Sequence, residues 1–155
     1  MTDTMVQVFQ SQEDEISAVS SWINARITDG VSPGEIGVFV RSENEFDRAE
    51  SAVIRSGNQW AKLTDAPIID GGQIAIGTMH LAKGLEFRAV AVMACDDEVL
   101  PSQTRIESVA DDADLEEVYN TERHLLYVAC TRARDFLWVS GVEPASEFLD
   151  DLENT

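Results

Sequence analysis

The sequence predicts an α/β fold of three layers, in which helices cover both faces of a mostly parallel central sheet. Short apolar runs of strand character alternate with longer helix-forming segments along the whole chain. The best-defined apolar runs, over 36–41 and 88–95, are continuous, as is typical of strands that are buried on both faces. The 155 residues, 44% of them apolar, suffice for one domain with a single core.

The first half of the chain contains two predicted strand–helix pairs. Ser11 and Asp14 resemble a capping box at the start of the first helix, and Gly30 stands where a helix-ending glycine belongs. Ser42 and Glu45 form the predicted capping box of the second helix. The strands are expected over residues 5–9 and 36–41, and the helices over 11–30 and 42–57.

The second half of the chain adds the remaining predicted strands and helices. A loop is expected over 64–72, and the polar stretch over 96–114, which contains Pro101, is the best candidate for a mobile loop. Asp114 with Glu117 caps a long helix, whose second half is apolar nearly all round and is expected to be buried on several sides. The strands are expected over 58–63, 73–79, 88–95 and 136–141, and the helices over 115–134 and 144–152.

The charge balance weighs against one class of function. The net charge is −18, from 29 acidic and 11 basic residues. A surface this acidic repels phosphate backbones, so the chain by itself is not expected to bind nucleic acids non-specifically. Many of the acidic residues concentrate at 96–98 and over 107–117.

The sequence also lacks the signals of several other classes of protein. Neither Lys62 nor Lys83 follows a glycine, so the chain has no P-loop. No apolar run approaches the roughly 18 residues of a membrane span, and the first ten residues do not read as a secretory signal. Cys95 and Cys130 lie in apolar runs and are expected to be buried free thiols in a reducing cytoplasm, with no metal site.

The stretch GTMHLAKGLEFRAV places unusual residue types between two predicted buried strands. Buried strands have no need of His80, Lys83, Gly84 or Glu86, which suggests that this segment meets a ligand. Functional groups of parallel sheets collect beyond the carboxyl ends of the strands, and both this segment and Arg41 follow such an end. We therefore expect these residues along one edge of the sheet.

The long helix is expected to end in YVACTRAR, with Arg132 on the same face as Val128 and Ala129. Taken alone, this arginine has two interpretations. Its side chain either lies over an apolar surface and complements the helix dipole, or holds a guanidinium out to meet phosphate. Arg123 lies about half a turn round the helix from Arg132 and cannot serve the same site.

Three stretches of the chain occur in a recognisable order, namely IGVFVRSENEFDRAESAVIRSG, IAIGTMHLAKGLEFRAVAVMAC and ERHLLYVACTRARDFLWVSG. They resemble motifs IV, V and VI of the UvrD/Rep-type superfamily 1 DNA helicases. The resemblance covers the chain from about residue 5 to 150, and the last two motifs are the specific ones. It implies that the three-layer α/β fold is RecA-like.

The resemblance further implies that residues 1–155 form the second, C-terminal RecA-like domain of such a helicase, as a single domain. In that family ATP with Mg²⁺ lies in a cleft between two RecA-like domains, and the N-terminal one carries the P-loop that is missing here. The whole protein is expected to hydrolyse ATP and move along single-stranded DNA, whereas the isolated chain is expected to be inactive. The family's large helical insertion before motif V is absent, because this branch lacks it or because it was removed.

The resemblance also assigns roles to single residues. Thr78 and His80 are expected to face the single-stranded DNA track, and Gly84 and Glu86 to face the nucleotide. Gly84 permits close approach of the backbone, and Glu86 accepts hydrogen bonds from the ribose or from water near the metal. The alternatives are an ordinary strand-end role for His80 and a helix-start role for Glu86. Lys83 either positions the loop or touches the ligand, and it is not assigned to the catalytic set.

Arg41 and Arg132 match the two arginines that this family directs at the γ-phosphate. A positioned guanidinium stabilises the negative charge that phosphoryl transfer spreads over the equatorial oxygens. This chain departs from the family at one position. The family commonly has an aromatic residue just before the motif IV arginine, which stacks on adenine, whereas this chain has Val40 there. Tyr127 is expected to pack within the domain rather than touch a ligand.

Two rival functions stay open. A RecA-like module without catalysis, which serves protein interaction in a DNA repair complex, is favoured by the acidic charge and opposed by the presence of Arg41, Glu86 and Arg132. A nuclease-linked repair subunit, with its nuclease outside this chain, is the other. A P-loop in the residues that precede this chain supports the motor, and its absence supports the interaction module.

Overall fold

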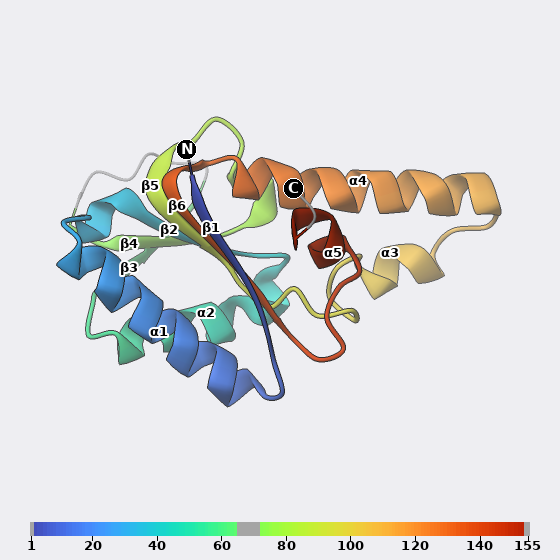
Figure 1. The fold of residues 1–155 in the computed structure, drawn as a ribbon. Helices are drawn as coiled ribbons and strands as arrows, with labels where there is room; N and C mark the ends of the chain where they lie inside the picture. Colours follow the sequence, from blue (N-terminus) through green and yellow to red (C-terminus); the bar gives the residue numbers. More distant parts are fainter. Residues whose placement is uncertain (1, 65–71, 154–155) are drawn as a thin grey trace.

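The computed structural model describes residues 2–64 and 72–153, in which a six-stranded sheet has only parallel strand pairs (Figure 1). The strand order is β1-β6-β5-β2-β4-β3. This arrangement, with helices on both faces, confirms the predicted α/β fold. The strands are β1 (Asp3–Phe9), β2 (Ile36–Val40), β3 (Trp60–Lys62), β4 (Ile74–Thr78), β5 (Phe87–Val92) and β6 (Ala133–Val142).

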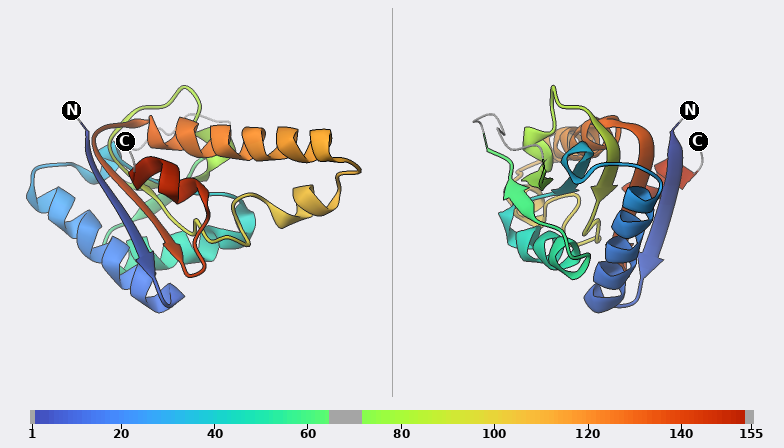
Figure 2. Two further views of the ribbon diagram at one scale, coloured as in Figure 1. Left: turned by 45° about the vertical axis from the view of Figure 1, so that its right-hand side comes forward. Right: turned by 90° about the vertical axis from the view of Figure 1, so that its left-hand side faces the viewer.

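Helices α1 (Gln12–Thr28) and α2 (Phe46–Arg55) cover one face of the sheet (Figures 1 and 2). The hydroxyl of Ser11 accepts a hydrogen bond from a backbone N–H in the first turn of α1, at 3.1 Å, as the sequence predicts. Gly30 follows this helix with a φ of 104°, a conformation that favours glycine. Alternate residues of the strands pack beneath these two helices in one buried core.

The opposite face is covered by α4 (Asp112–Cys130), α5 (Phe148–Glu153) and the segment 79–86, which begins with the 3₁₀ helix η3 (Met79–Leu81). This segment crosses from the carboxyl end of β4 to the amino end of β5 and packs against α4. Its apolar side chains share a second core with those of α4, β5 and β6. Both the segment and α4 therefore run between the two edges of the sheet.

The long helix ends at Cys130, earlier than predicted. From Ala133 onward the chain joins β6, which lies between β1 and β5 and pairs with both. Hydrogen bonds to two neighbouring strands outweigh the helix propensity of the TRAR stretch. Arg132 therefore follows the helix and Arg134 lies in a strand, so the predicted helical positions of both arginines are wrong.

The second half of α4 is not buried on several sides. One stripe is buried, and Tyr127, on another side of the helix, is 37% exposed instead of packed within the domain. The N-terminal half of α4 extends beyond the sheet together with the short helix α3 (Gln103–Glu107), which forms inside the stretch predicted as an irregular loop (Figure 1). With the sheet on one side only, α4 needs a single apolar stripe.

The Ser42 hydroxyl donates to the Glu45 carboxylate at 2.6 Å, so the predicted capping box is replaced by a bond between side chains ahead of α2. The predicted loop over 64–72 lies mostly outside the described residues. No helix in the described ranges is long and apolar enough to cross a membrane.

Candidate functional site

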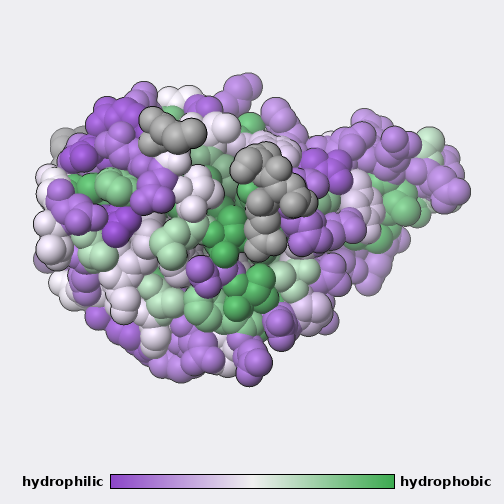
Figure 3. Space-filling model, in the orientation of Figure 1, coloured by the Kyte–Doolittle hydropathy of each residue, from purple (hydrophilic) through white to green (hydrophobic). Residues whose placement is uncertain are grey.

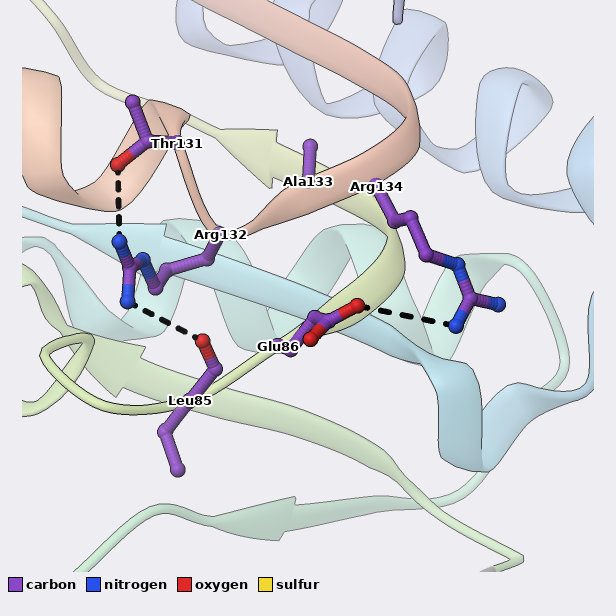
Figure 4. A pocket seen from close by; sticks show the side chains of 6 residues that line it. All are labelled: Leu85, Glu86, Thr131, Arg132, Ala133 and Arg134. Atoms are coloured by element: carbon purple, nitrogen blue, oxygen red, sulfur yellow. Dashed lines mark hydrogen bonds and ion pairs between the residues drawn. The ribbon is translucent and has the colours of Figure 1, made fainter.

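A shallow pocket of about 290 Å³ opens at the amino ends of β5 and β6 (Figure 4). It forms where segment 79–86 and the end of α4 lead into two neighbouring strands, whose first residues, Phe87 and Ala133, are paired. Residues that are far apart in the sequence are thus brought together. The pocket is lined by Leu85, Glu86, Thr131, Arg132, Ala133 and Arg134.

Arg132 is held at this pocket by neutral acceptors. Its Nε donates to the Val128 carbonyl at 3.1 Å, and its two terminal nitrogens donate to the Leu85 carbonyl at 3.4 Å and the Thr131 hydroxyl at 3.1 Å (Figure 4). The Val128 carbonyl belongs to the last turn of α4, so the guanidinium also complements the helix dipole. Among the described carboxylates none forms an ion pair with Arg132. Its charge is positioned but not neutralised.

Glu86 and Arg134 face each other at the same pocket (Figure 4). An oxygen of Glu86 lies 3.7 Å from a terminal nitrogen of Arg134, and the two side chains are 68% and 55% exposed. An exposed pair of this length is weak, so either group can exchange its partner for a ligand. Gly84 precedes them with a φ of 82° and open space where a Cβ would stand.

At the carboxyl edge of the sheet, Arg41 makes a buried ion pair that no local sequence pattern predicts. It follows β2, and its Nε and one terminal nitrogen each donate to a carboxylate oxygen of Glu122 in α4 at 2.7 Å. Arg41 is 7% exposed and Glu122 is fully buried. In this two-bond arrangement the charge of Arg41 is neutralised inside the fold.

Glu122 accepts two further hydrogen bonds, from the backbone N–H of Ser102 at 2.7 Å and from Arg105 at 2.9 Å. Burial disfavours its charged form, but the bonds from Arg41 and Ser102 outweigh burial and lower the pKa of Glu122. A sequence signal for this role existed. Glu122 stands four residues from both Val118 and Leu126 on the buried stripe of α4, where an acid needs partners.

His80 lies at the same edge as Arg41, as predicted, and Thr78 lies there too. Thr78 ends β4 and pairs in register with Val40. His80 is exposed in η3, and its Nε2 lies 3.1 Å from the remaining terminal nitrogen of Arg41. Partial burial of the ring and the nearby Arg41 lower the pKa of His80, which keeps the imidazole neutral at neutral pH.

The expected gathering of Arg41 with the whole stretch 80–86 along one edge holds for His80 but not for Glu86, which lines the pocket of Arg132 at the opposite edge. The backbone N–H of Phe87, at the start of β5, donates to the carbonyl of Arg132. Val92, five residues on, pairs with Phe39, and Arg41 follows two residues later. At about 3.3 Å per residue the two edges are roughly 20 Å apart. Arg41 therefore belongs with His80, at the edge opposite to the pocket that holds Arg132.

The two cysteines are buried free thiols, as predicted. Burial raises the pKa of Cys130 to about 12 and that of Cys95 well above its usual range, so neither is a reactive thiolate at neutral pH. Within the described ranges, no group of three or more His, Cys, Asp and Glu side chains is arranged to hold a metal ion.

Comparison with known proteins identifies helicase relatives. The family model of the UvrD-like helicase C-terminal domain matches residues 59–143. DNA helicase II of Rickettsia typhi is 36% identical over 80 residues, which are 52% of this chain and 11% of that protein. ATP-dependent DNA helicase PcrA of Staphylococcus epidermidis is 40% identical over 68 residues, 44% of this chain and 9% of that protein. The chain thus spans about a tenth of the length of these relatives.

A solved structure supports the fold over nearly the whole chain. The C-terminal domain of a possible DNA helicase from Lactobacillus plantarum WCFS1 superposes with a TM-score of 0.67. The match covers 96% of this chain and 78% of that one, at 22% sequence identity. At this identity the likeness establishes the shared fold, including the region before residue 59 that the family model does not cover.

Proposed function

The chain belongs to the UvrD-like helicase C-terminal domain family, and from this we propose that it is the second RecA-like motor domain of an ATP-dependent DNA helicase or translocase. The pocket at the amino edge receives the phosphates of ATP with its Mg²⁺, and the carboxyl edge forms part of the single-stranded DNA track. A first RecA-like domain supplies the P-loop, because this chain contains none.

The observation that carries this proposal is the uncompensated guanidinium of Arg132 in an open pocket. Phosphoryl transfer spreads negative charge over the equatorial oxygens, and a guanidinium fixed beforehand stabilises that charge without reorganising. The carbonyls of Val128 and Leu85 hold the group in place and leave its charge for a ligand. A fixed cation of this kind is what an arginine finger requires.

Glu86, which lines the pocket, and Gly84, which lies two residues before it, fit the nucleotide side of the site. The open space beside Gly84 lets a ligand approach the backbone closely. The exposed carboxylate of Glu86 lines the pocket and can accept hydrogen bonds from ribose hydroxyls or from water that surrounds the metal. Its ion pair with Arg134 is weak enough to be exchanged for such partners.

Thr78 and His80 fit a contact to nucleic-acid phosphates at the carboxyl edge, since both offer neutral hydrogen-bond donors beyond the end of β4. Two neutral donors on a chain of net charge −18 make a weak site alone, so the first RecA-like domain contributes the rest of the track. Segment 79–86 and α4 link this edge to the ATP pocket.

ATP turnover stimulated by single-stranded DNA, measured on the full-length protein, tests the proposal. Arg132→Ala should lower kcat by about 10³-fold or more, and Arg132→Lys should restore little of it, because an ammonium lacks the planar fork. Arg55→Ala is the matched control, since Arg55 is a surface arginine that pairs with Glu13 on α1. A near-normal kcat for Arg132→Ala would contradict the finger assignment.

A second candidate is a catalytically inactive RecA-like module that binds proteins in a DNA repair complex. It is favoured by the arm formed by residues 103–121, which projects from the body and is mostly hydrophilic (Figures 1 and 3). The six acidic residues of this arm are all exposed, against the single basic residue Arg105. A full-length protein without any DNA-stimulated ATP turnover supports this candidate over the motor.

A further inference from the structure

The contacts of Arg41 fix the protonation state of a neighbouring imidazole. Two of its three nitrogens donate to the oxygens of Glu122, each at 2.7 Å, and the third lies 3.1 Å from Nε2 of His80. A guanidinium carries donors only. Nε2 of His80 must therefore be the unprotonated acceptor, and the proton of the neutral ring resides on Nδ1.

The Nδ1–H group is the one donor that this ring can still offer. In the part of the chain that the structure describes, Nδ1 has no hydrogen-bond partner, and the His80 side chain is exposed at the carboxyl edge. Thr78 lies two residues away with a hydroxyl at the same edge. An exposed N–H beside a hydroxyl suits an acceptor such as a phosphate oxygen.

We propose that Glu122 is a positioning residue which, through Arg41, fixes His80 as a neutral Nδ1–H donor for a phosphate oxygen of a nucleic-acid backbone. The choice of nucleic acid as ligand rests on the proposed function. The relay Glu122–Arg41–His80 rests on the contacts alone.

The surroundings of Glu122 make this relay rigid. Its fully buried carboxylate accepts from Arg41, from the backbone of Ser102 and from Arg105, so donors from two separate segments, the end of β2 and the start of α3, hold it. A guanidinium bound to both carboxylate oxygens cannot rotate without breaking both bonds. The direction in which Arg41 presents its third nitrogen to His80 is therefore set by α4.

The electrostatic surroundings agree with a neutral ring. Burial and the charge of Arg41 lower the pKa of His80, Arg105 adds to this, and the opposing effect of Glu122 is smaller. These are the charged groups that face the ring from the end of β2, from α3 and from α4. Because a neutral donor displaces no counterions, the contact fixes the position of a strand and adds little salt dependence.

Tautomer assignment by NMR on the ¹⁵N-histidine-labelled chain tests the relay. The chain has two histidines, and His124, exposed on α4, gives a reference signal. We expect the Nδ1–H tautomer for His80 at pH 7 and a pKa below its ordinary value of 6.5. An Nε2–H tautomer or a protonated ring at pH 7 in the unsubstituted chain would overturn the proposal.

Substitutions separate the relay from simple burial of the ring. In Glu122→Gln the fork of Arg41 loses its anchor, and in Arg41→Lys the charge stays while the fork is lost, so His80 should shift towards the Nε2–H tautomer in both. Backbone amide spectra show whether each variant is folded. Retention of a pure Nδ1–H signal in a folded Glu122→Gln variant would overturn the role of Glu122.

A titration with single-stranded oligothymidylate at low ionic strength tests the ligand. We expect the Nδ1 signal of His80 to move while the signals of His124 stay in place. The phosphate contact would be overturned if the His80 signals stay unmoved when the other signals that respond to the oligonucleotide have stopped changing. The same holds if they stay unmoved at the highest oligonucleotide concentration. The ATP pocket is judged separately, by turnover of the Arg132 variants, so the two failures are distinguishable.

Discussion

Arg41 and Arg132 lie at opposite edges of one sheet and differ in what surrounds them. Arg41 gives two short hydrogen bonds to a buried carboxylate, so its charge is cancelled inside the fold. Arg132 gives its hydrogen bonds to two carbonyls and a hydroxyl, so its charge persists at an open pocket. A guanidinium is available to an anionic ligand where the fold satisfies its donors without neutralising it.

Because the two arginines differ in this way, substitutions at the two edges should have different effects on stability and on activity. Removing one partner of a buried ion pair leaves the other charge buried and unpaired, which costs about 3–5 kcal/mol. Removing an arginine that caps a helix end at the surface costs about 1 kcal/mol or less. The carboxyl edge should therefore respond to substitution by losing stability, and the amino edge by losing activity.

The largest effect on stability is expected at Glu122. Glu122→Ala leaves Arg41 buried without its carboxylate, so the free energy of unfolding should fall by about 3–5 kcal/mol. Urea denaturation of the isolated chain measures this, and Glu117→Ala, five residues earlier on the exposed side of α4, is the control. Equal unfolding free energies for the two variants would contradict the prediction that the carboxyl edge carries the stability.

Acid should weaken the carboxyl edge for the same reason. The pKa of Glu122 lies below its ordinary value of 4.5 in the folded chain, so the folded state binds fewer protons there than the unfolded state. The stabilisation is complete above pH 4.5 and is lost as the pH falls through the folded pKa. The melting temperature should drop over this range, and less steeply in Glu122→Gln. Parallel curves for the two proteins would count against this prediction.

The sequence predicted the helices and strands of the first half well, because their signals are local. Ser11 and Gly30 act within a few residues of themselves. The end of α4 was wrong, because Ala133 joins a strand through partners that lie far away in the sequence. The pair of Arg41 and Glu122 spans 81 residues, so it depends on how α4 packs on the sheet, which no local pattern shows.

A smaller effect concerns ligands of the isolated chain. It should not hydrolyse ATP, because the P-loop is missing, and it should bind single-stranded DNA weakly at physiological salt, because its net charge is −18. Phosphate release and a fluorescence titration measure the two properties. Sub-micromolar DNA affinity at that salt would reveal a basic track outside the edges described here, and reproducible ATP turnover would contradict the divided site.

The smallest effect on stability is expected for Arg134→Ala. The ion pair of Arg134 with Glu86 is long and exposed, so the unfolding free energy should change by no more than about 0.5 kcal/mol. Denaturation under the conditions used for Glu122→Ala makes the comparison direct. A loss approaching that of Glu122→Ala would show that the pocket is part of the structural framework and would blur the distinction between the edges.

The side-by-side behaviour of Arg132→Ala and Arg41→Ala tests the central claim most directly. Thermal melting of the isolated chain and DNA-stimulated kcat of the full-length protein are measured for both variants. Arg132→Ala should melt close to the unsubstituted chain and lose about 10³-fold or more in kcat, whereas Arg41→Ala should lose about 3–5 kcal/mol of stability. The claim that Arg132 serves activity and Arg41 serves stability would be contradicted if Arg132→Ala lowered the stability but left kcat unchanged, while Arg41→Ala left the stability unchanged.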